Sequence, residues 1–212
     1  MKKKMIIAAG IGLFLLFAIG FIYCWFNYQF WSHLDTSTFD SLTEYNSERV
    51  KAYRGRQILI HRDFHPLMVK ITRYAAQCDL TLLITQSYRI PGRRTKNCIV
   101  PPAVKSNHLA GHAVDFNIRF NGRLFESNDI RKETLRLAPA NVKAFIGMLV
   151  SDDSLRWGGE FKEEDPVHVD DGLNTEYPEK WNACYRACLK DLSGAKKKHT
   201  VWIKRIIPFA AF

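Results

Sequence analysis

Two short segments of the chain carry residues whose types and spacing could support metal-dependent chemistry. The first holds His108 and Asp115, seven positions apart, with small residues between them. The second holds His168, with Asp165 three positions before it. Two imidazoles and one carboxylate make three protein ligands, the number that a catalytic zinc keeps when it leaves one position for water. A further carboxylate nearby is what that water needs as a proton acceptor.

Alternating side chains predict how two of these ligands meet. Residues 113–118 alternate between apolar and polar side chains, as a half-buried strand does, and Asp115 falls on the polar face. Residues 167–170 alternate in the same way and put His168 on their polar face. If the two strands are neighbours, both side chains point at one spot, and His108 arrives from the loop before the first strand. We therefore predict a zinc site, since calcium prefers oxygen ligands and copper prefers thiolate or further imidazoles.

Four other residues are expected around this site. Asp165 should lie in the turn entering the second strand, where Pro166 is tolerated, and act as general base toward zinc-bound water. Asp170 is placed to orient an imidazole, and Ser106 belongs to the same outer layer. Arg89, just after a buried strand, is a candidate cation for the oxyanion or for a substrate carboxylate.

The remaining histidines are not predicted to bind this metal. His112 follows His108 by four positions, which would suit two ligands on a helix, but on a strand it points away from the face of Asp115. The others lack organised partners in the sequence and are interpreted as structural or solvent-exposed: His33, His61, His65 and His199.

The cysteines after the N-terminal segment are Cys78, Cys98, Cys184 and Cys188. Four cysteines in an oxidising compartment allow three pairings, and a sequence does not choose among them. None of the four has a nearby Cys-x-x-Cys, so zinc binding by their thiols is disfavoured. We interpret them as buried or disulfide-bonded structural residues.

The N-terminus has the features of a membrane segment. Three lysines precede residues 5–26, which carry no charge and are long enough, at about 22 residues, to cross a hydrocarbon core of about 30 Å. The lysines favour a cytoplasmic N-terminus, with the rest of the chain across the membrane. A retained signal-anchor is preferred to a cleaved signal peptide, whose apolar core is usually about 7–15 residues. Lipidation of Cys24 is disfavoured, because bulky residues precede it.

The rest of the 212 residues divides into a tether (27–51), one domain (52–192) and a basic, apolar C-terminal extension (193–212). Helices and strands are intermixed without a regular βαβ repeat, which predicts the α+β class: a single domain with a small, mostly antiparallel sheet flanked by helices. Asn121-Gly122 predicts a hairpin turn. The predicted helices are 66–78, 140–150 and 178–192, and the predicted strands are 80–85, 113–118, 155–157 and 167–170. The extension could lie on an anionic membrane surface or pack on the domain with a solvated basic patch.

The first segment, Ser-x-His-x-x-Gly-x-Ala-x-Asp over residues 106–115, is followed by acid-x-x-His at 165–168. This pattern resembles the zinc peptidases of bacterial cell walls. That family includes D-alanyl-D-alanine carboxypeptidases and dipeptidases, and the L-alanyl-D-glutamate endopeptidases of phage endolysins. The resemblance covers about residues 66–170. It implies the three zinc ligands predicted above, Asp165 as catalytic base and Arg89 as the group that stabilises the carbonyl oxygen.

The implied activity is hydrolysis of a bond in the stem peptides of peptidoglycan. An aspartate as base and the sequence Trp-Gly-Gly-Glu-Phe at 157–161 look more like L-Ala-D-Glu endopeptidases, with D-alanyl-D-alanine carboxypeptidase as the alternative. Glu160, Asp170 and Ser87 depart from the family pattern and bear on substrate preference. A non-catalytic, zinc-stabilised wall-binding or lysis-partner module is the alternative of another class.

The resemblance also implies a location and a partner. A single-pass chain in the bacterial inner membrane would expose its domain to peptidoglycan on the periplasmic side, either for wall maintenance or for prophage lysis. The formal net charge of +10 would suit an anionic wall polymer, and no nucleic-acid partner is expected.

Overall fold

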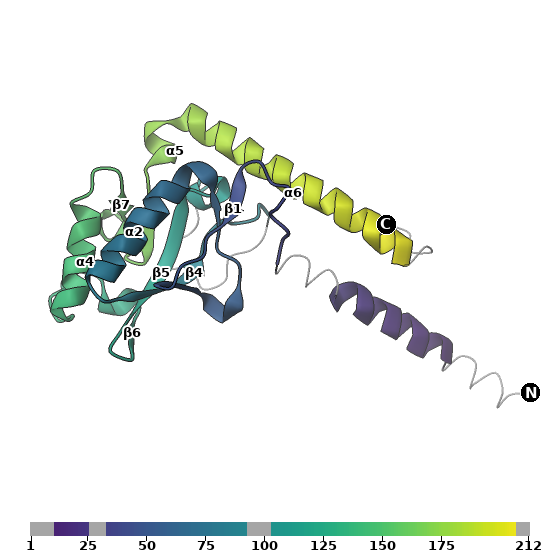
Figure 1. Cartoon of the computed structure of the whole chain (residues 1–212), viewed down its shortest axis with the longest axis horizontal. Helices are drawn as coiled ribbons and strands as arrows, with labels where there is room; N and C mark the ends of the chain where they lie inside the picture. The colour runs from purple at the N-terminus through teal and green to yellow at the C-terminus, as the bar shows by residue number, and fades with distance from the viewer. Residues whose placement is uncertain (1–10, 26–32, 93–102, 207–212) are drawn as a thin grey trace, which may run out of the picture. The chain divides into compact units, whose positions relative to one another are not determined.

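Figure 1 shows the computed structural model of the chain, which describes residues 11–25, 33–92 and 103–206, with side chains up to residue 199. The chain divides into two units, Met1–Asp35 and Thr36–Phe212. Within the first unit, residues 11–25 form a helix. The rest of the predicted membrane segment 5–26 lies outside the described residues. No helix in the described part of the chain is both long and apolar enough to cross a membrane.

The second unit is built on a six-stranded sheet in the order β2-β4-β5-β8-β7, with β6 paired to β5. Only the β2–β4 pair is parallel, and the other pairs of this sheet are antiparallel. A separate pair joins β1 (Leu42–Glu44) to β3 (Leu59–His61). This arrangement confirms the predicted α+β class. The strands of the main sheet are β2 (Val50–Ala52), β4 (Thr81–Gln86), β5 (Ala113–Phe120), β6 (Arg123–Phe125), β7 (Arg156–Trp157) and β8 (His168–Asp170).

Helices cover the apolar face of this sheet. Phe116 of β5 is fully buried and meets Phe145 edge to face, with ring centroids 5.7 Å apart. The helices of this layer contact each other (Figure 1) and are α2 (His65–Gln77) and α4 (Ala140–Val150). The remaining helices are α3 (Lys132–Leu135), α5 (Leu173–Glu176) and α6 (Pro178–Ile206). Short 3-10 turns are η1 (Tyr53–Gly55), η2 (Arg62–Phe64), η3 (Asn107–Ala110), η4 (Ser127–Asp129) and η5 (Gly158–Glu160).

The alternation predicted for β5 is confirmed, and it leaves one face of the strand for chemistry. Val114, Phe116 and Ile118 are fully buried in the core, whereas Asp115 and Asn117 of the opposite face are only partly buried. The strand ends in the predicted hairpin, because Asn121 and Gly122 both take positive φ, 47° and 77°, as a two-residue primed turn requires.

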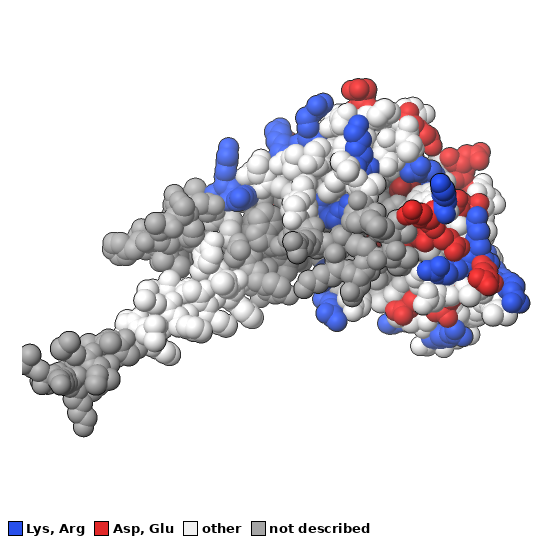
Figure 2. Space-filling model, turned by 180° about the vertical axis from the view of Figure 1, so that it is seen from behind, with Lys and Arg blue, Asp and Glu red and all other residues white. Residues whose placement is uncertain are grey.

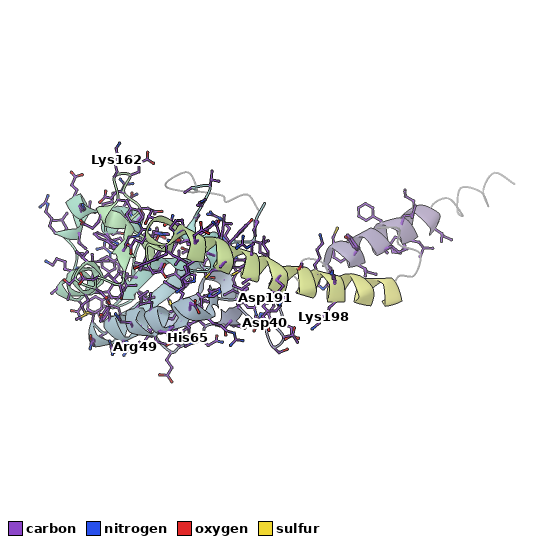
Figure 3. All side chains as sticks on the ribbon, turned by 90° about the horizontal axis from the view of Figure 1, so that it is seen from above. Asp40, Arg49, His65, Lys162, Asp191 and Lys198 are labelled. Atoms are coloured by element: carbon purple, nitrogen blue, oxygen red, sulfur yellow. The ribbon has the colours of Figure 1, made fainter. Side chains whose placement is uncertain are left out.

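The predicted tether is wrong for its second half. Residues 42–44 and 50–52 are strands, and Leu42 and Val50 are buried. The carboxylate of Asp191 on α6 accepts backbone N–H bonds from Asp40, Ser41 and Leu42 at 2.9–3.0 Å. Figure 3 shows Asp40 and Asp191 close together along α6. The composition of 36–51 gave no sign of this, because its strands pair with β3 and β4 and its backbone binds Asp191, about 150 positions later.

The C-terminal helix also differs from the prediction, whereas the described cysteines of the second unit are buried, as one of the two predicted alternatives had it. The helix predicted to end at 192 runs to Ile206, so the extension 193–212 begins as continuous helix rather than as a separate part. Among the described cysteines Cys78, Cys184 and Cys188 are buried and free, so no disulfide joins them. Cys98 lies outside the described residues.

On the face of the second unit drawn in Figure 2, acidic and basic side chains are interspersed and none of its described parts carries a broad patch of one sign. The net charge of +10 is therefore not gathered there into a single binding surface.

Candidate metal centre

The centre forms where β5 and β8 pair. Their antiparallel register puts Asp115 directly opposite His168, so both side chains leave the sheet on the same face. The predicted neighbour relation of the two strands is thus confirmed.

His108 enters from η3, and a glycine sets its position. Gly111 ends η3 with φ of 73°, in the left-handed region that favours glycine. A Cβ at this position would lie 2.6 Å from the backbone nitrogen of His61, whose N–H donates to the Gly111 carbonyl at 2.9 Å. Only a residue without a side chain lets η3 approach β3 this closely.

Three atoms converge at the centre. His108 Nε2 lies 3.1 Å from Asp115 Oδ1 and 3.1 Å from His168 Nδ1, and the last two atoms are 3.0 Å apart. Bonds of about 2.0–2.2 Å to a tetrahedral zinc ion hold neighbouring ligand atoms about 3.3 Å apart. The observed separations are close to that value, so these three residues fit a metal ion.

The outer hydrogen bonds show why the inner atoms suit a cation. His108 Nδ1 lies 2.8 Å from the Ser87 carbonyl, and His168 Nε2 lies 3.0 Å from Asp170 Oδ2. Both partners only accept, so both ring nitrogens must donate, and the inner nitrogens present lone pairs. Together with the Asp115 carboxylate, three acceptors face one another, an arrangement that requires a shared proton or a metal ion.

The pKa values of His168 and Asp115 also indicate that the three acceptors share a proton. Burial would lower the pKa of His168, but its hydrogen bonds to Asp115 and Asp170 outweigh burial and raise the pKa to about 10. For Asp115, burial would raise the pKa, yet His108 and His168 hold it well below its usual range. Without an ion, the cluster therefore retains a proton that a metal would displace.

Arg156 fixes the carboxylate behind His168. Its Nε and Nη2 atoms donate to the two oxygens of Asp170 at 2.8 and 3.0 Å, and Asp170 is only 3% exposed. The paired contact locks the plane of the carboxylate that orients the imidazole. Arg156 was not predicted, because its position opposite Asp170 depends on the pairing of β7 with β8, which neither strand shows by itself.

Asp165 lies beside the cluster in the turn before β8, as predicted. Its N–H donates to the Gly158 carbonyl at 2.9 Å, and its own carbonyl accepts from His168 N–H at 2.9 Å. A Cβ on Gly158 would lie 2.2 Å from that Asp165 carbonyl, so this close approach needs glycine. Asp165 Oδ1 is buried and has no hydrogen-bond partner among the described residues. Burial, and then the charge of Asp115, raise its pKa.

Two predicted residues reach this region through their backbones. The N–H of Arg89 donates to the His108 carbonyl at 2.9 Å, next to the centre. The Ser106 carbonyl accepts from Trp181 Nε1 at 3.3 Å, and among the described residues the Ser106 hydroxyl makes no hydrogen bond to the cluster. The roles predicted for these two side chains stay predictions.

A second group of metal-ligating side chains was missed. His61, Asp63, His112 and Cys184 each offer a ligand atom within 4.8 Å of the others. His112 does point away from the first centre, as its strand position predicted, but it has a partner of its own: Nδ1 lies 2.7 Å from Asp171 Oδ2. No local pattern in the sequence points to this group, because Cys184 lies far along the chain from His61 and His112.

A comparison with known families finds a match over the segment that carries the first centre. A family model described as D-alanyl-D-alanine carboxypeptidase matches residues 101–171, about a third of the chain. A comparison with curated proteins finds none that matches. The matched segment contains all three converging residues, Asp165 and Asp170. Over residues 101–171 the chain thus matches a family of cell-wall peptidases, as the resemblance in its sequence predicted.

Proposed function

We propose that the chain is a zinc-dependent peptidase that hydrolyses a bond in the stem peptides of peptidoglycan. The observation that carries this proposal is the triangle of acceptor atoms about 3 Å apart, with the unpartnered carboxylate of Asp165 beside it. The family match supports a peptidase that acts on peptidoglycan. A zinc ion held by His108, Asp115 and His168 would polarise the scissile carbonyl and make a bound water more acidic.

Two residues around the triangle would supply proton transfer and charge stabilisation. Asp165 Oδ1 is free to take a proton from the attacking water and to return it to the leaving amine. The raised pKa of Asp165 suits a group that must hold a proton between these two steps. Arg89, whose backbone lies against His108, would stabilise the carbonyl oxygen as negative charge develops there.

For the bond cleaved, we infer L-Ala-D-Glu. An aspartate in the position of the base and the sequence at residues 157–161 support endopeptidase activity, with D-alanyl-D-alanine carboxypeptidase as the alternative. Within that sequence, Gly158 helps to place the base, because only a residue without a side chain admits the turn that carries Asp165.

The test is digestion of purified peptidoglycan by the zinc-loaded protein, with the fragments identified by mass spectrometry. New D-Glu amino termini are expected. Release of D-Ala alone would replace the endopeptidase by the carboxypeptidase. Binding to the wall without any new amino terminus would reject the enzyme and favour the non-catalytic module.

We also propose that residues 5–26 anchor the chain in the bacterial inner membrane with the second unit on the periplasmic side. The three N-terminal lysines and the uncharged run that follows support this placement. In spheroplasts, external protease should then digest the second unit, and carbonate washing should leave the chain in the membrane. Resistance to protease in intact spheroplasts would contradict the orientation.

A further inference from the structure

The second group of ligating side chains comes from three elements and one connecting segment. His61 ends β3 and Asp63 lies in η2, His112 lies between η3 and β5, and Cys184 lies on α6. Their ligand atoms lie within 4.8 Å of one another. None of the four belongs to the triangle at the first centre.

His112 shows that something is missing from this group. The side chain is buried, with 1% of the residue exposed, and Nδ1 donates to Asp171 Oδ2 at 2.7 Å. Nε2 therefore carries a lone pair, and it is buried without a hydrogen-bond partner among the described residues. A buried acceptor that stays unpaired destabilises the fold, so this atom needs a partner. A carboxylate behind one ring nitrogen and a free lone pair on the other is also the arrangement of Asp170 and His168 at the first centre.

Cys184 supplies a donor that the first centre lacks. The residue is buried, and burial raises the pKa of its thiol, so it is inert unless a cation draws off its proton. Cys184 is free, so its thiol is not used in a disulfide bond. A buried thiol next to an unpaired imidazole is a soft pair of ligands, which selects zinc over calcium or magnesium.

His61 and Asp63 complete the set on the solvent side. The Asp63 side chain is 50% exposed and lies 3.6 Å from Lys180 Nζ, so it can turn toward an ion at little cost. His61 Nδ1 accepts the Asp63 N–H at 3.1 Å, a capping bond that coordination by His61 would have to share or replace. The open side also gives an ion a way in.

We propose that the chain binds a second zinc ion through these four side chains. This structural site, in which protein ligands fill all four coordination positions, is distinct from the proposed catalytic centre. Four ligands, two of them imidazoles and one a thiolate, match the tetrahedral coordination of structural zinc. The ion would join α6 and η2 to the segment just after His108, and would thereby hold the C-terminal helix against the loop of the first centre. The proposal does not depend on the peptidase activity.

Metal content of the full chain gives the first test. After equilibration with zinc and removal of free metal, two zinc ions per chain are expected. Cys184→Ala should retain one. The matched control is Cys188→Ala, a buried cysteine one turn further along α6 and outside the group, which should retain two.

Cobalt substitution distinguishes the two sites, because only the second contains sulfur. The cobalt-loaded protein should show a sulfur-to-cobalt charge-transfer band that Cys184→Ala abolishes and Cys188→Ala keeps. A protein that binds one cobalt ion without this band has only the first centre, which overturns the second site and leaves the proposed function standing. A band with one ion per chain would instead reject the first centre alone.

The wild-type chain also answers the question if Cys184→Ala does not fold. Zinc should slow alkylation of Cys184 at least tenfold relative to the chelated protein, measured by mass spectrometry of the peptide that contains it. Alkylation of Cys188 is the internal reference for general unfolding. Equal protection of the two cysteines by zinc, or protection of neither, would overturn the proposal.

Discussion

At the scale of single residues, the hydrogen bonds on the outside of the first centre determine what its inside can bind. The Ser87 carbonyl and the Asp170 carboxylate each accept a hydrogen bond from an imidazole N–H, so the opposite nitrogens face inward with their lone pairs. Arg156 keeps the Asp170 carboxylate in place. The ligand set is therefore oriented before any ion arrives, which lowers the cost of binding one.

Asp165 tests the proposed chemistry apart from the metal. Asp165→Asn removes the carboxylate that would accept the proton but keeps its shape, so activity on peptidoglycan should fall about 10²–10⁴-fold. Zinc content should not change, because Asp165 is outside the triangle. Glu163→Gln is the control, an exposed acid in the same turn that should stay fully active. Full activity of the Asp165 variant would remove this residue as the base.

At the scale of elements, two glycines admit the close approaches on which the centre depends. Gly111 brings η3 against β3, and Gly158 admits the turn that carries Asp165. The first approach can be separated from the conformational preference of glycine, because Gly122 has a similar φ of 77° but nothing within 4 Å of where its Cβ would be.

Gly111→Ala and Gly122→Ala form a matched pair. Gly122→Ala should cost only the left-handed backbone penalty, about 1–2 kcal/mol of unfolding free energy. Gly111→Ala adds a clash with the backbone of His61, so it should cost clearly more and should also weaken zinc binding by displacing His108. Denaturant unfolding and zinc titration measure the two effects. Equal losses of stability would show that the close approach is unimportant.

Asp191 joins the first strand of the second unit to the last helix. It is 7% exposed and accepts three backbone N–H bonds from residues 40–42. Asp191→Ala leaves those donors without a partner, and the free energy of unfolding should fall by at least about 2 kcal/mol. Asp153→Ala, at an exposed acid, should change it by less than about 0.5 kcal/mol. Urea unfolding gives both values. If Asp191→Ala leaves the free energy of unfolding unchanged, the contact with α6 does not stabilise residues 36–44.

At the scale of the whole molecule, pH and the proposed zinc ion would act on the same cluster. In the metal-free protein, burial opposes but hydrogen bonds to Asp115 and Asp170 raise the pKa of His168 from 6.5 to about 10. A raised pKa in the folded state contributes stability that is complete below pH 6.5 and is lost as the pH rises toward about 10.

The chelated protein should therefore lose stability between pH 6.5 and about 10, whereas the zinc-loaded protein should lose less, because an ion takes the place of the proton. Thermal unfolding across this range, with chelator and with zinc, should show a gap in Tm that widens as the pH rises. His168→Gln has no titrating imidazole, so its chelated form should lack this slope. A constant gap would contradict the shared-proton description of the cluster.

Local patterns predicted most of the elements, and long-range pairing set the limit. The alternation around Asp115 and His168 gave the face of each side chain, because it depends only on neighbouring residues. That β5 and β8 pair, with these two residues in register, depends on contacts 53 positions apart and could only be assumed. The same limit explains the misread tether, the overlooked Arg156 and the unexpected group around His112, whose Cys184 lies on the last helix.

The register of β5 and β8 also bears on how fast the molecule comes apart. Asp115 and His168 belong to strands that must separate during unfolding, so an ion bound by both side chains would have to be released before β5 and β8 part. Interactions made only in the finished structure slow unfolding more than they speed folding. Saturating zinc should accordingly lengthen the unfolding half-life in denaturant while barely altering the refolding rate. The ion would then contribute kinetic stability to the native state.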